Sequence, residues 1–236
     1  MLKRVLSWSA VAALVLAAGA ARWTASSAAE PVRLVPPPAV DETAAAPTET
    51  AVLAGGCFWG VQGVFQHVDG VTAAVSGYAG GTAGTAHYEM TSSGTTGHAE
   101  SVRITFDPHR ITYGRLLQIY FSVAHDPTEL NRQGPDSGTQ YRSAIFPQSP
   151  EQARIAADYI AQLNQAKAFP EPVVTTVEPD KQFYPAEAYH QNYLTLHPDQ
   201  PYIAINDLPK VSALQQLFPD RYRSSPVLVE TAQAAK

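Results

Sequence analysis

The sequence predicts an α+β fold in which helices pack against one sheet. Short apolar runs that end at glycine or polar residues are typical of strands, and TAVLAGG at residues 50–56 is the first of them. Longer stretches carry apolar residues at nearly helical spacing, as FWGVQGVFQHV does at residues 58–68. The two kinds of segment alternate irregularly along the chain, and this order favours the α+β class.

The other expected strands follow in order. VTAAVSGY at residues 71–78 is a second apolar run. In AESVRITFD at residues 99–107 the apolar residues Val102, Ile104 and Phe106 alternate, which places them on one face of a strand. Shorter strands are expected at residues 144–146 and 173–178.

The other expected helices cover residues 112–125 and 149–166. The second of these begins with Ser149, Pro150 and Glu151, a good cap and first turn. Residues 183–197 read as a loop leading into a short helix, and residues 212–218 as a last helix.

Two long segments, residues 79–97 and 125–143, lack apolar periodicity and are expected as loops. Long loops inside a compact domain are uncommon and are usually functional. These two loops are therefore the first places to look for residues of a site.

The ends of the chain differ in composition from its middle. Residues 1–29 start with Lys3 and Arg4, continue with an apolar run and offer an Ala-Gly-Ala site, which is the pattern of a secretory signal peptide; an uncleaved membrane anchor is the alternative. Residues 30–50 are rich in proline, alanine and threonine and read as a semi-extended linker. One domain is expected over residues 51–220, followed by a loose tail at residues 221–236.

Composition excludes some classes of function. The 236-residue chain has a net charge of -5, and its cationic residues are scattered, so no nucleic-acid partner is expected. A single cysteine rules out cysteine-type metal spacing, and no metal site is expected. Exported proteins usually pair their cysteines, so one unpaired cysteine indicates either a reactive thiol or an intermolecular bond; an inert buried residue is the other alternative.

The surroundings of Cys57 favour a reactive thiol. It lies between a strand and the first turn of a helix in AGGCFWGVQGVF, residues 54–65. Helix N-terminal N–H groups favour a thiolate, and the neighbouring glycines let the backbone bend and leave room for a ligand. Phe58 and Trp59 would wall an apolar pocket, although such residues are more often ordinary core.

Five ordered motifs resemble the A-type peptide methionine sulfoxide reductases. They are GGCFWGV, GYAGGT, TTGHAESVRITFDP, HDPTELNRQGPDSGTQYRSAIF and FYPAEAYHQNYL, and the resemblance covers nearly all of residues 52–218. It implies a two-layer, ferredoxin-like α+β sandwich with a central mixed sheet. It also implies reduction of the S epimer of methionine sulfoxide, free or in proteins, as a repair of oxidative damage.

The chemistry of that reaction needs a nucleophile for the sulfur and an acid for the oxygen. By the resemblance, Cys57 is the nucleophile and Glu100 is the acid, which must keep its proton near neutral pH. The resemblance also implies the substrate-binding residues. Phe58 and Trp59 would form the methyl pocket, and Tyr88 and Tyr141 would be the hydroxyl donors. Asp136 would be a carboxylate that acts through ordered water.

Several of these residues also have an ordinary structural interpretation. Glu100 alone would more often be a solvated carboxylate at a strand end, and Tyr88 and Tyr141 would more often be half-buried packing residues. His98 is read as a structural hydrogen-bonding residue. Two other classes of function remain: a cysteine hydrolase or acyltransferase with His98 or His190 as base, and a binding module for methionine-like ligands.

The chain departs from many family members in having no second cysteine to resolve the sulfenic acid left on Cys57. No bound cofactor is expected, and an external thiol must act as reductant, either a thioredoxin- or glutaredoxin-type protein or a small thiol. The expected location is the periplasm or the medium, with membrane contact only if the N-terminal segment stays uncleaved. A monomer is the default expectation.

Overall fold

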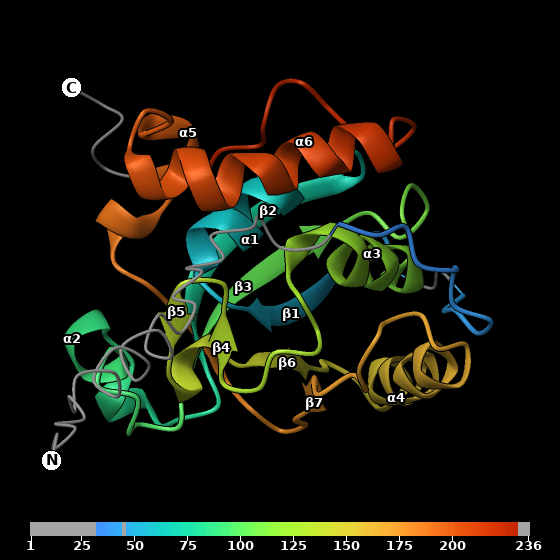
Figure 1. The fold of residues 1–236 in the computed structure, drawn as a ribbon, viewed down its shortest axis with the longest axis horizontal. Helices are drawn as coiled ribbons and strands as arrows, with labels where there is room; N and C mark the ends of the chain where they lie inside the picture. Colours follow the sequence, from blue (N-terminus) through green and yellow to red (C-terminus); the bar gives the residue numbers. More distant parts are fainter. Residues whose placement is uncertain (1–31, 44–45, 231–236) are drawn as a thin grey trace, which may run out of the picture.

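The computed structural model describes residues 32–43 and 46–230 (Figure 1). A six-stranded sheet with the order β7-β6-β1-β3-β2-β8 forms the centre of the domain. Its strands are β1 (Glu49–Gly55), β2 (Val71–Ala79), β3 (Ala99–Phe106), β6 (Ser143–Phe146), β7 (Thr176–Val177) and β8 (Phe183–Pro185). Only the β6–β7 pair is parallel, so the sheet is mixed.

The ferredoxin-like arrangement predicted by the resemblance is confirmed. Helix α1 (Phe58–Gln66) connects β1 to β2, and α3 (Tyr113–Ile119) connects β3 to β6. The four strands lie in the order β6-β1-β3-β2 with every neighbour antiparallel. This is the order of the split βαβ motif, in which each helix crosses over one strand.

Alternation along β1 separates two apolar clusters. Ala51 and Leu53 belong to the main core together with residues of α1 and α3, whereas Val52 and Ala54 join a smaller cluster on the opposite face. The period of two residues in a strand produces this division. The site described below therefore rests on a sheet buried on both faces.

Helices α4, α5 and α6 follow β6 along the chain. Helix α4 (Pro150–Gln165) begins at Ser149, whose hydroxyl accepts a hydrogen bond from the Gln152 N–H, as its sequence predicts. Helix α5 (Tyr193–Leu196) is one turn long, and α6 (Leu208–Leu217) packs against α1. Figure 1 shows α6 above the sheet and α4 below it, near the edge formed by β6 and β7.

Some local predictions are less accurate. The expected helix over residues 112–125 changes to a wider π-helical turn at Tyr120–Ala124, and the strand expected at 173–178 contains only two strand residues. The long loops contain the one-turn helix α2 (Tyr88–Thr91), the two-residue strands β4 (Arg132–Gln133) and β5 (Asp136–Ser137), and a 3-10 turn at Thr139–Tyr141. Such short elements leave no apolar period in the sequence.

Residues 32–43 of the expected linker lie against the domain, and we call them the N-terminal strap. The last two residues of that linker, Glu49 and Thr50, already belong to β1. Val35 is buried, and its carbonyl accepts a hydrogen bond from the Gln118 side chain. The Asp41 carboxylate accepts bonds from the Thr112 hydroxyl and the Gly114 N–H at the start of α3. These contacts attach the strap to the start of α3.

The expected loose tail also has contacts. The Val227 N–H donates to the Gln66 carbonyl, and Val229 exchanges two hydrogen bonds with the Asn192 side chain. Residues 1–29, predicted as a signal peptide, lie outside the described residues. Within the described part of the chain, no helix has the length and hydropathy needed to cross a bilayer.

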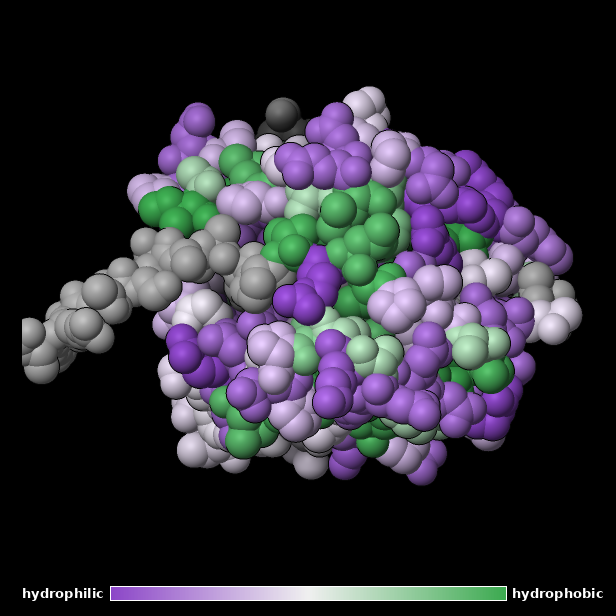
Figure 2. Space-filling view, turned by 45° about the vertical axis from the view of Figure 1, so that its right-hand side comes forward, coloured by the Kyte–Doolittle hydropathy of each residue, from purple (hydrophilic) through white to green (hydrophobic). Residues whose placement is uncertain are grey.

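The surface is mostly polar. Figure 2 shows hydrophobic residues gathered near the middle of one face, with hydrophilic residues around them. Val32 and Leu34 of the N-terminal strap are among the exposed apolar side chains, as is Ile205 beside α6.

Candidate active site

Cys57 lies where the sequence places it, between the end of β1 and the first residue of α1. Gly56 before it has a φ of +85°, and a Cβ there would lie 2.5 Å from the Gln133 Cβ. Only glycine combines this backbone conformation with such a close neighbour. The thiol is consequently held at the N-terminus of α1, with 8% of the residue exposed.

Sheet register brings Glu100 beside Cys57. Leu53 pairs with Val102, so the antiparallel strands place Glu100 at the level of the end of β1. Its Oε2 accepts a 3.0 Å hydrogen bond from the Phe58 N–H, the residue directly after Cys57. Burial raises the pKa of the Glu100 carboxyl to about 8, although the Phe58 hydrogen bond opposes the shift. Glu100 is therefore protonated at neutral pH, unlike a solvated carboxylate at a strand end.

The expectation that the helix keeps the Cys57 thiol ionised is wrong for the resting site. Burial raises the pKa of the thiol well above its ordinary value, and the negative charges that Glu100 and Asp207 carry when ionised raise it further. The backbone hydrogen bond from Trp59 lowers it, but by less. Desolvation and nearby carboxylates thus outweigh the helix terminus, and the resting cysteine is a neutral thiol.

Aromatic rings surround the start of α1. Trp59 stacks on Tyr193 with ring centroids 3.9 Å apart and an interplanar angle of 10°. Phe58 is buried and lies 4.9 Å from the ring of His190. Phe58 thus belongs to the buried core, whereas Trp59 is half-buried and packs against that core. Both rings lie directly after Cys57 in α1, so packing in the core and lining a pocket beside the thiol are compatible roles.

Tyr88 and Tyr141 reach the same region from the two long loops. The Glu100 charge raises the pKa of each hydroxyl in addition to the larger effect of burial, and the Cys57 charge contributes to both. The Tyr88 N–H donates a 3.0 Å bond to Glu187, while the ring of Tyr88 lies 4.5 Å from that of His190.

Asp136 accepts a hydrogen bond from the Tyr202 hydroxyl. Burial raises the pKa of Asp136, and the bond from Tyr202 lowers it. Sequence reasoning missed Tyr202 and the fully buried Asp207, whose charge acts on both Cys57 and Glu100. Both lie in PYIAIND, residues 201–207, a segment with no pattern that connects it to the other site residues.

The two histidines considered as bases have other partners. His98 accepts from the Gly81 N–H at 3.2 Å, and its Nε2 lies 3.0 Å from the Thr82 carbonyl, which is a structural role. Nδ1 of His190 accepts a 3.2 Å bond from the Trp59 indole, and burial lowers the pKa of the imidazole. These arrangements do not favour a cysteine hydrolase.

A family model described as peptide methionine sulfoxide reductase matches residues 49–222. The chain belongs to this family. It is 64% identical over 193 residues to a peptide methionine sulfoxide reductase MsrA 2 of Mesorhizobium japonicum, covering 82% of this chain and 99% of the relative. It is 49% identical over 175 residues to MsrA of Deinococcus radiodurans, covering 74% and 84% of the two chains.

Solved structures agree with this assignment. The reduced form of Mxr1 from Saccharomyces cerevisiae superposes with a TM-score of 0.61 at 30% identity, covering 71% of this chain and 96% of Mxr1. Methionine sulfoxide reductase A of Corynebacterium diphtheriae gives a TM-score of 0.55 at 34% identity, covering 72% and 87% of the two chains. This A-type reductase is accordingly a peptide-methionine (S)-S-oxide reductase, an oxidoreductase that acts on sulfur with a thiol as reductant.

Enzymes of the A type use no prosthetic cofactor. In the described ranges 32–43 and 46–230, no group of three or more His, Cys, Asp and Glu side chains is arranged to hold a metal ion.

Proposed function

We propose that Cys57 attacks the sulfur of methionine sulfoxide while Glu100 protonates its oxygen. The observation that carries this proposal is the buried Glu100 carboxyl, with a pKa of about 8, bonded to the backbone N–H that directly follows Cys57. A general acid is most effective when its pKa lies near the working pH, and this carboxyl meets that condition.

The surrounding side chains have separate binding roles in this proposal. Phe58 and Trp59 receive the methyl group, because an apolar wall suits a group that makes no hydrogen bonds. Tyr88 and Tyr141 donate hydrogen bonds to the sulfoxide oxygen. Their pKa values are raised, so both hydroxyls keep their protons and act as donors. Asp136 takes part in binding through ordered water.

The chemical step balances with the two protons of the resting site. The Cys57 sulfur forms a bond to the sulfoxide, Glu100 gives its proton to the oxygen, and the thiol proton passes to the Glu100 carboxylate. The reprotonated Glu100 then lets the oxygen leave as water, so the sulfur–oxygen bond of the substrate breaks and Cys57 stays bonded to the methionine sulfur as a sulfonium. A water molecule attacks the Cys57 sulfur and gives a proton back to Glu100. The bond between the two sulfurs breaks with its electron pair going to the substrate, which leaves methionine and a sulfenic acid on Cys57. The substrate sulfur is reduced and the cysteine sulfur is oxidised by two electrons.

An external thiol returns Cys57 to its resting state. Cys57 is the only cysteine in the sequence, so no intramolecular disulfide can form. A first thiol displaces water from the sulfenic acid and forms a mixed disulfide, and a second thiol releases Cys57 as a thiol. A thioredoxin- or glutaredoxin-type protein, or a small thiol, would supply both electrons.

The substrates proposed are methionine sulfoxide in oxidised proteins and the free amino acid. The test is a single turnover without reductant, using each epimer of a methionine sulfoxide peptide and of the free amino acid. One equivalent of methionine from the S epimer, and none from Cys57→Ser, is expected. No methionine from either epimer would overturn the proposal and favour the binding module.

We also propose that the protein is exported. The support is the sequence of residues 1–29, a basic start followed by an apolar run and a small-residue site. Fractionation of cells and determination of the mature N-terminus test it. A soluble periplasmic or secreted protein that starts after the apolar run is expected; a cytoplasmic protein that still begins at Met1 would contradict export.

A further inference from the structure

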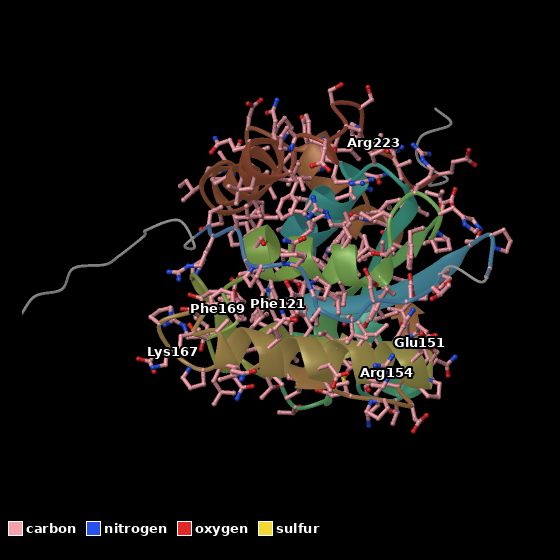
Figure 3. The ribbon with its side chains drawn as sticks, turned by 90° about the vertical axis from the view of Figure 1, so that its right-hand side faces the viewer. Phe121, Glu151, Arg154, Lys167, Phe169 and Arg223 are labelled. Carbon is pink, nitrogen blue, oxygen red and sulfur yellow. The ribbon has the colours of Figure 1, made fainter. Side chains whose placement is uncertain are left out.

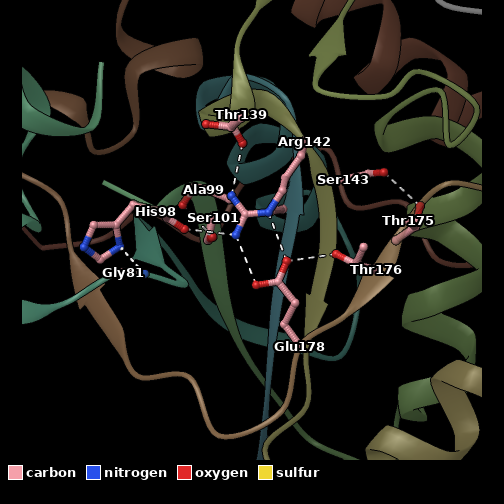
Figure 4. A network of polar contacts seen from close by, with 12 residues as sticks. Gly81, His98, Ala99, Ser101, Thr139, Arg142, Ser143, Thr175, Thr176 and Glu178 are labelled. Atoms are coloured by element: carbon pink, nitrogen blue, oxygen red, sulfur yellow. Dashed lines mark hydrogen bonds and ion pairs between the residues drawn. The ribbon is translucent and has the colours of Figure 1, made fainter. Parts of the chain in front are cut away.

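The Arg142 side chain connects three segments of the chain that lie far apart in sequence. Its Nε and Nη2 donate to the two carboxylate oxygens of Glu178 at 3.0 and 3.1 Å. Nη1 donates to the Thr139 carbonyl, and Nη2 donates to the Gly97 carbonyl, both at 3.1 Å (Figure 4). One guanidinium thus bonds to four acceptors, and only 16% of its side chain is exposed.

Two of these acceptors belong to segments that carry site residues. Thr139 begins the 3-10 turn that ends at Tyr141, the residue before Arg142. Only His98 lies between Gly97 and the first residue of β3, and Glu100 is the second residue of that strand. The guanidinium therefore bonds to the backbone of the Tyr141 turn and to the backbone that leads into the Glu100 strand.

The third segment is anchored independently of Arg142. The Glu178 N–H donates to the Ile145 carbonyl in β6, and the Glu178 carboxylate also accepts from the Thr176 hydroxyl. Burial raises the pKa of Glu178, but the hydrogen bonds and charge of Arg142 lower it to a value below the usual range. Glu178 is therefore an ionised and fixed partner for the guanidinium.

The space around the guanidinium is closely packed. Gly80 has a φ of +104°, and a Cβ there would lie 2.7 Å from Nη2 of Arg142 and 2.6 Å from the Gly97 carbonyl. A separate bond from the Thr139 hydroxyl to the Gly94 carbonyl also ties the Tyr141 turn to the segment that leads to Gly97. The guanidinium has little room to move. Its position therefore fixes the placement of the Tyr141 turn relative to the backbone around Gly97.

We propose that the Arg142–Glu178 pair is a positioning clamp that fixes the Tyr141 hydroxyl relative to the Glu100 carboxyl. This inference rests on the proposed function, in which both groups act on the same sulfoxide oxygen. Arg142 is a positioning residue, since its bonds go to backbone carbonyls and Glu178. Lysine cannot replace it, because an ammonium group cannot form the planar fork and reach both carbonyls as well.

The first test compares Arg142→Gln, Arg142→Lys and Glu178→Gln with the wild type in single-turnover kinetics of the S epimer. The rate at saturating sulfoxide should fall about 10- to 100-fold in both Arg142 variants and less in Glu178→Gln, because misplacing a group that acts in the transition state reduces rate. The concentration for half-saturation should change less than about threefold, because the interaction acts mainly in the transition state. The matched control is Arg154→Gln, because Arg154 lies on α4 (Figure 3). This change removes an exposed 3.3 Å ion pair to Asp158 and should leave the rate unchanged.

The second test asks whether Arg142 acts through Tyr141. Tyr141→Phe and Arg142→Gln are combined, and the double variant should be no slower than the slower single variant, because both changes impair the same donor. Hydrogen exchange of segments 94–99 and 138–142 should also increase in Arg142→Gln, and this readout does not depend on turnover.

Three outcomes separate the hypotheses. If the wild type is active and Arg142→Gln reacts at the same rate, the clamp proposal is wrong. Fully multiplicative losses in the double variant would overturn it as well, because they would show that Arg142 acts on something other than Tyr141. An inactive wild type would contradict the proposed function. In that case the hydrogen exchange of Arg142→Gln still tests the clamp, and unchanged exchange in segments 94–99 and 138–142 would overturn it.

Discussion

Replacing Glu100 with glutamine should make the protein more stable at alkaline pH while it slows catalysis. Glutamine keeps the shape of the side chain and an oxygen that can accept the 3.0 Å hydrogen bond from the Phe58 N–H, but it carries no ionisable proton. The variant therefore separates the need for an acid from the need for a hydrogen-bond acceptor at this position.

The magnitude follows from the pKa of the carboxyl, which burial raises from 4.5 to about 8. A carboxyl with a higher pKa in the folded state favours folding while it is protonated. Its contribution is complete below about pH 4.5 and is lost as the pH rises through about 8. At about 1.36 kcal/mol per pKa unit, the difference between these two values corresponds to about 5 kcal/mol of unfolding free energy.

Urea denaturation of the wild type and Glu100→Gln at about pH 5 and about pH 9 measures this contribution. The wild type should lose more stability than the variant between the two conditions, by up to about 4 kcal/mol, because part of the contribution is already lost at about pH 5. Glu42, whose pKa burial raises to about 7, titrates in both proteins and cancels in the difference. Equal losses in the two proteins would refute the assignment of a raised pKa to Glu100.

Three other changes test separate parts of the site and fold. Trp59→Ala removes a wall of the methyl pocket, and kcat/KM for the sulfoxide should fall about 10- to 200-fold in steady-state kinetics. Tyr202→Phe removes the donor to Asp136, so the pKa of Asp136 should rise in an NMR titration, because the hydrogen bond that lowers it is lost. Asp41→Ala removes the strap's acceptor at the start of α3, and thermal unfolding should show a loss of about 1 kcal/mol with unchanged turnover.

Each of these changes has an outcome that would count against the account. An unaltered kcat/KM in Trp59→Ala would place the methyl group elsewhere. An unaltered Asp136 titration would mean that Tyr202 does not hold the carboxylate. Impaired turnover in Asp41→Ala would mean that the N-terminal strap affects the site as well as the stability of α3.

The sequence predicts those features of the site that depend on local pattern. The glycines before Cys57 and the apolar spacing after it indicate a strand, a bend and a helix, and the structure has all three. The irregular order of strands and helices likewise predicts the α+β class. The ferredoxin-like topology and the role of Glu100 come from the family resemblance, because neither has a local signal.

Contacts between distant segments cannot be read from the sequence. Tyr202 and Asp136 are bonded although 66 residues separate them. The thiolate prediction for Cys57 is wrong for the same reason, because burial and the charge of Asp207 come from parts of the chain that only the fold brings together. The N-terminal strap is similar: nothing in its proline-rich composition shows that Asp41 meets the start of α3.

The most direct test of the central claim is the pH dependence of Cys57 oxidation in a single turnover with the S epimer. Rapid quenching with a sulfenic-acid trap and intact mass measurement give the rate at each pH. Because Glu100 must carry a proton and its pKa is about 8, the rate should be level below that pH and fall about tenfold per unit above it. In Glu100→Gln the rate should be low and nearly independent of pH. A wild-type rate that rises through pH 8 would show instead that ionisation of the thiol limits the reaction and that Glu100 does not supply the proton.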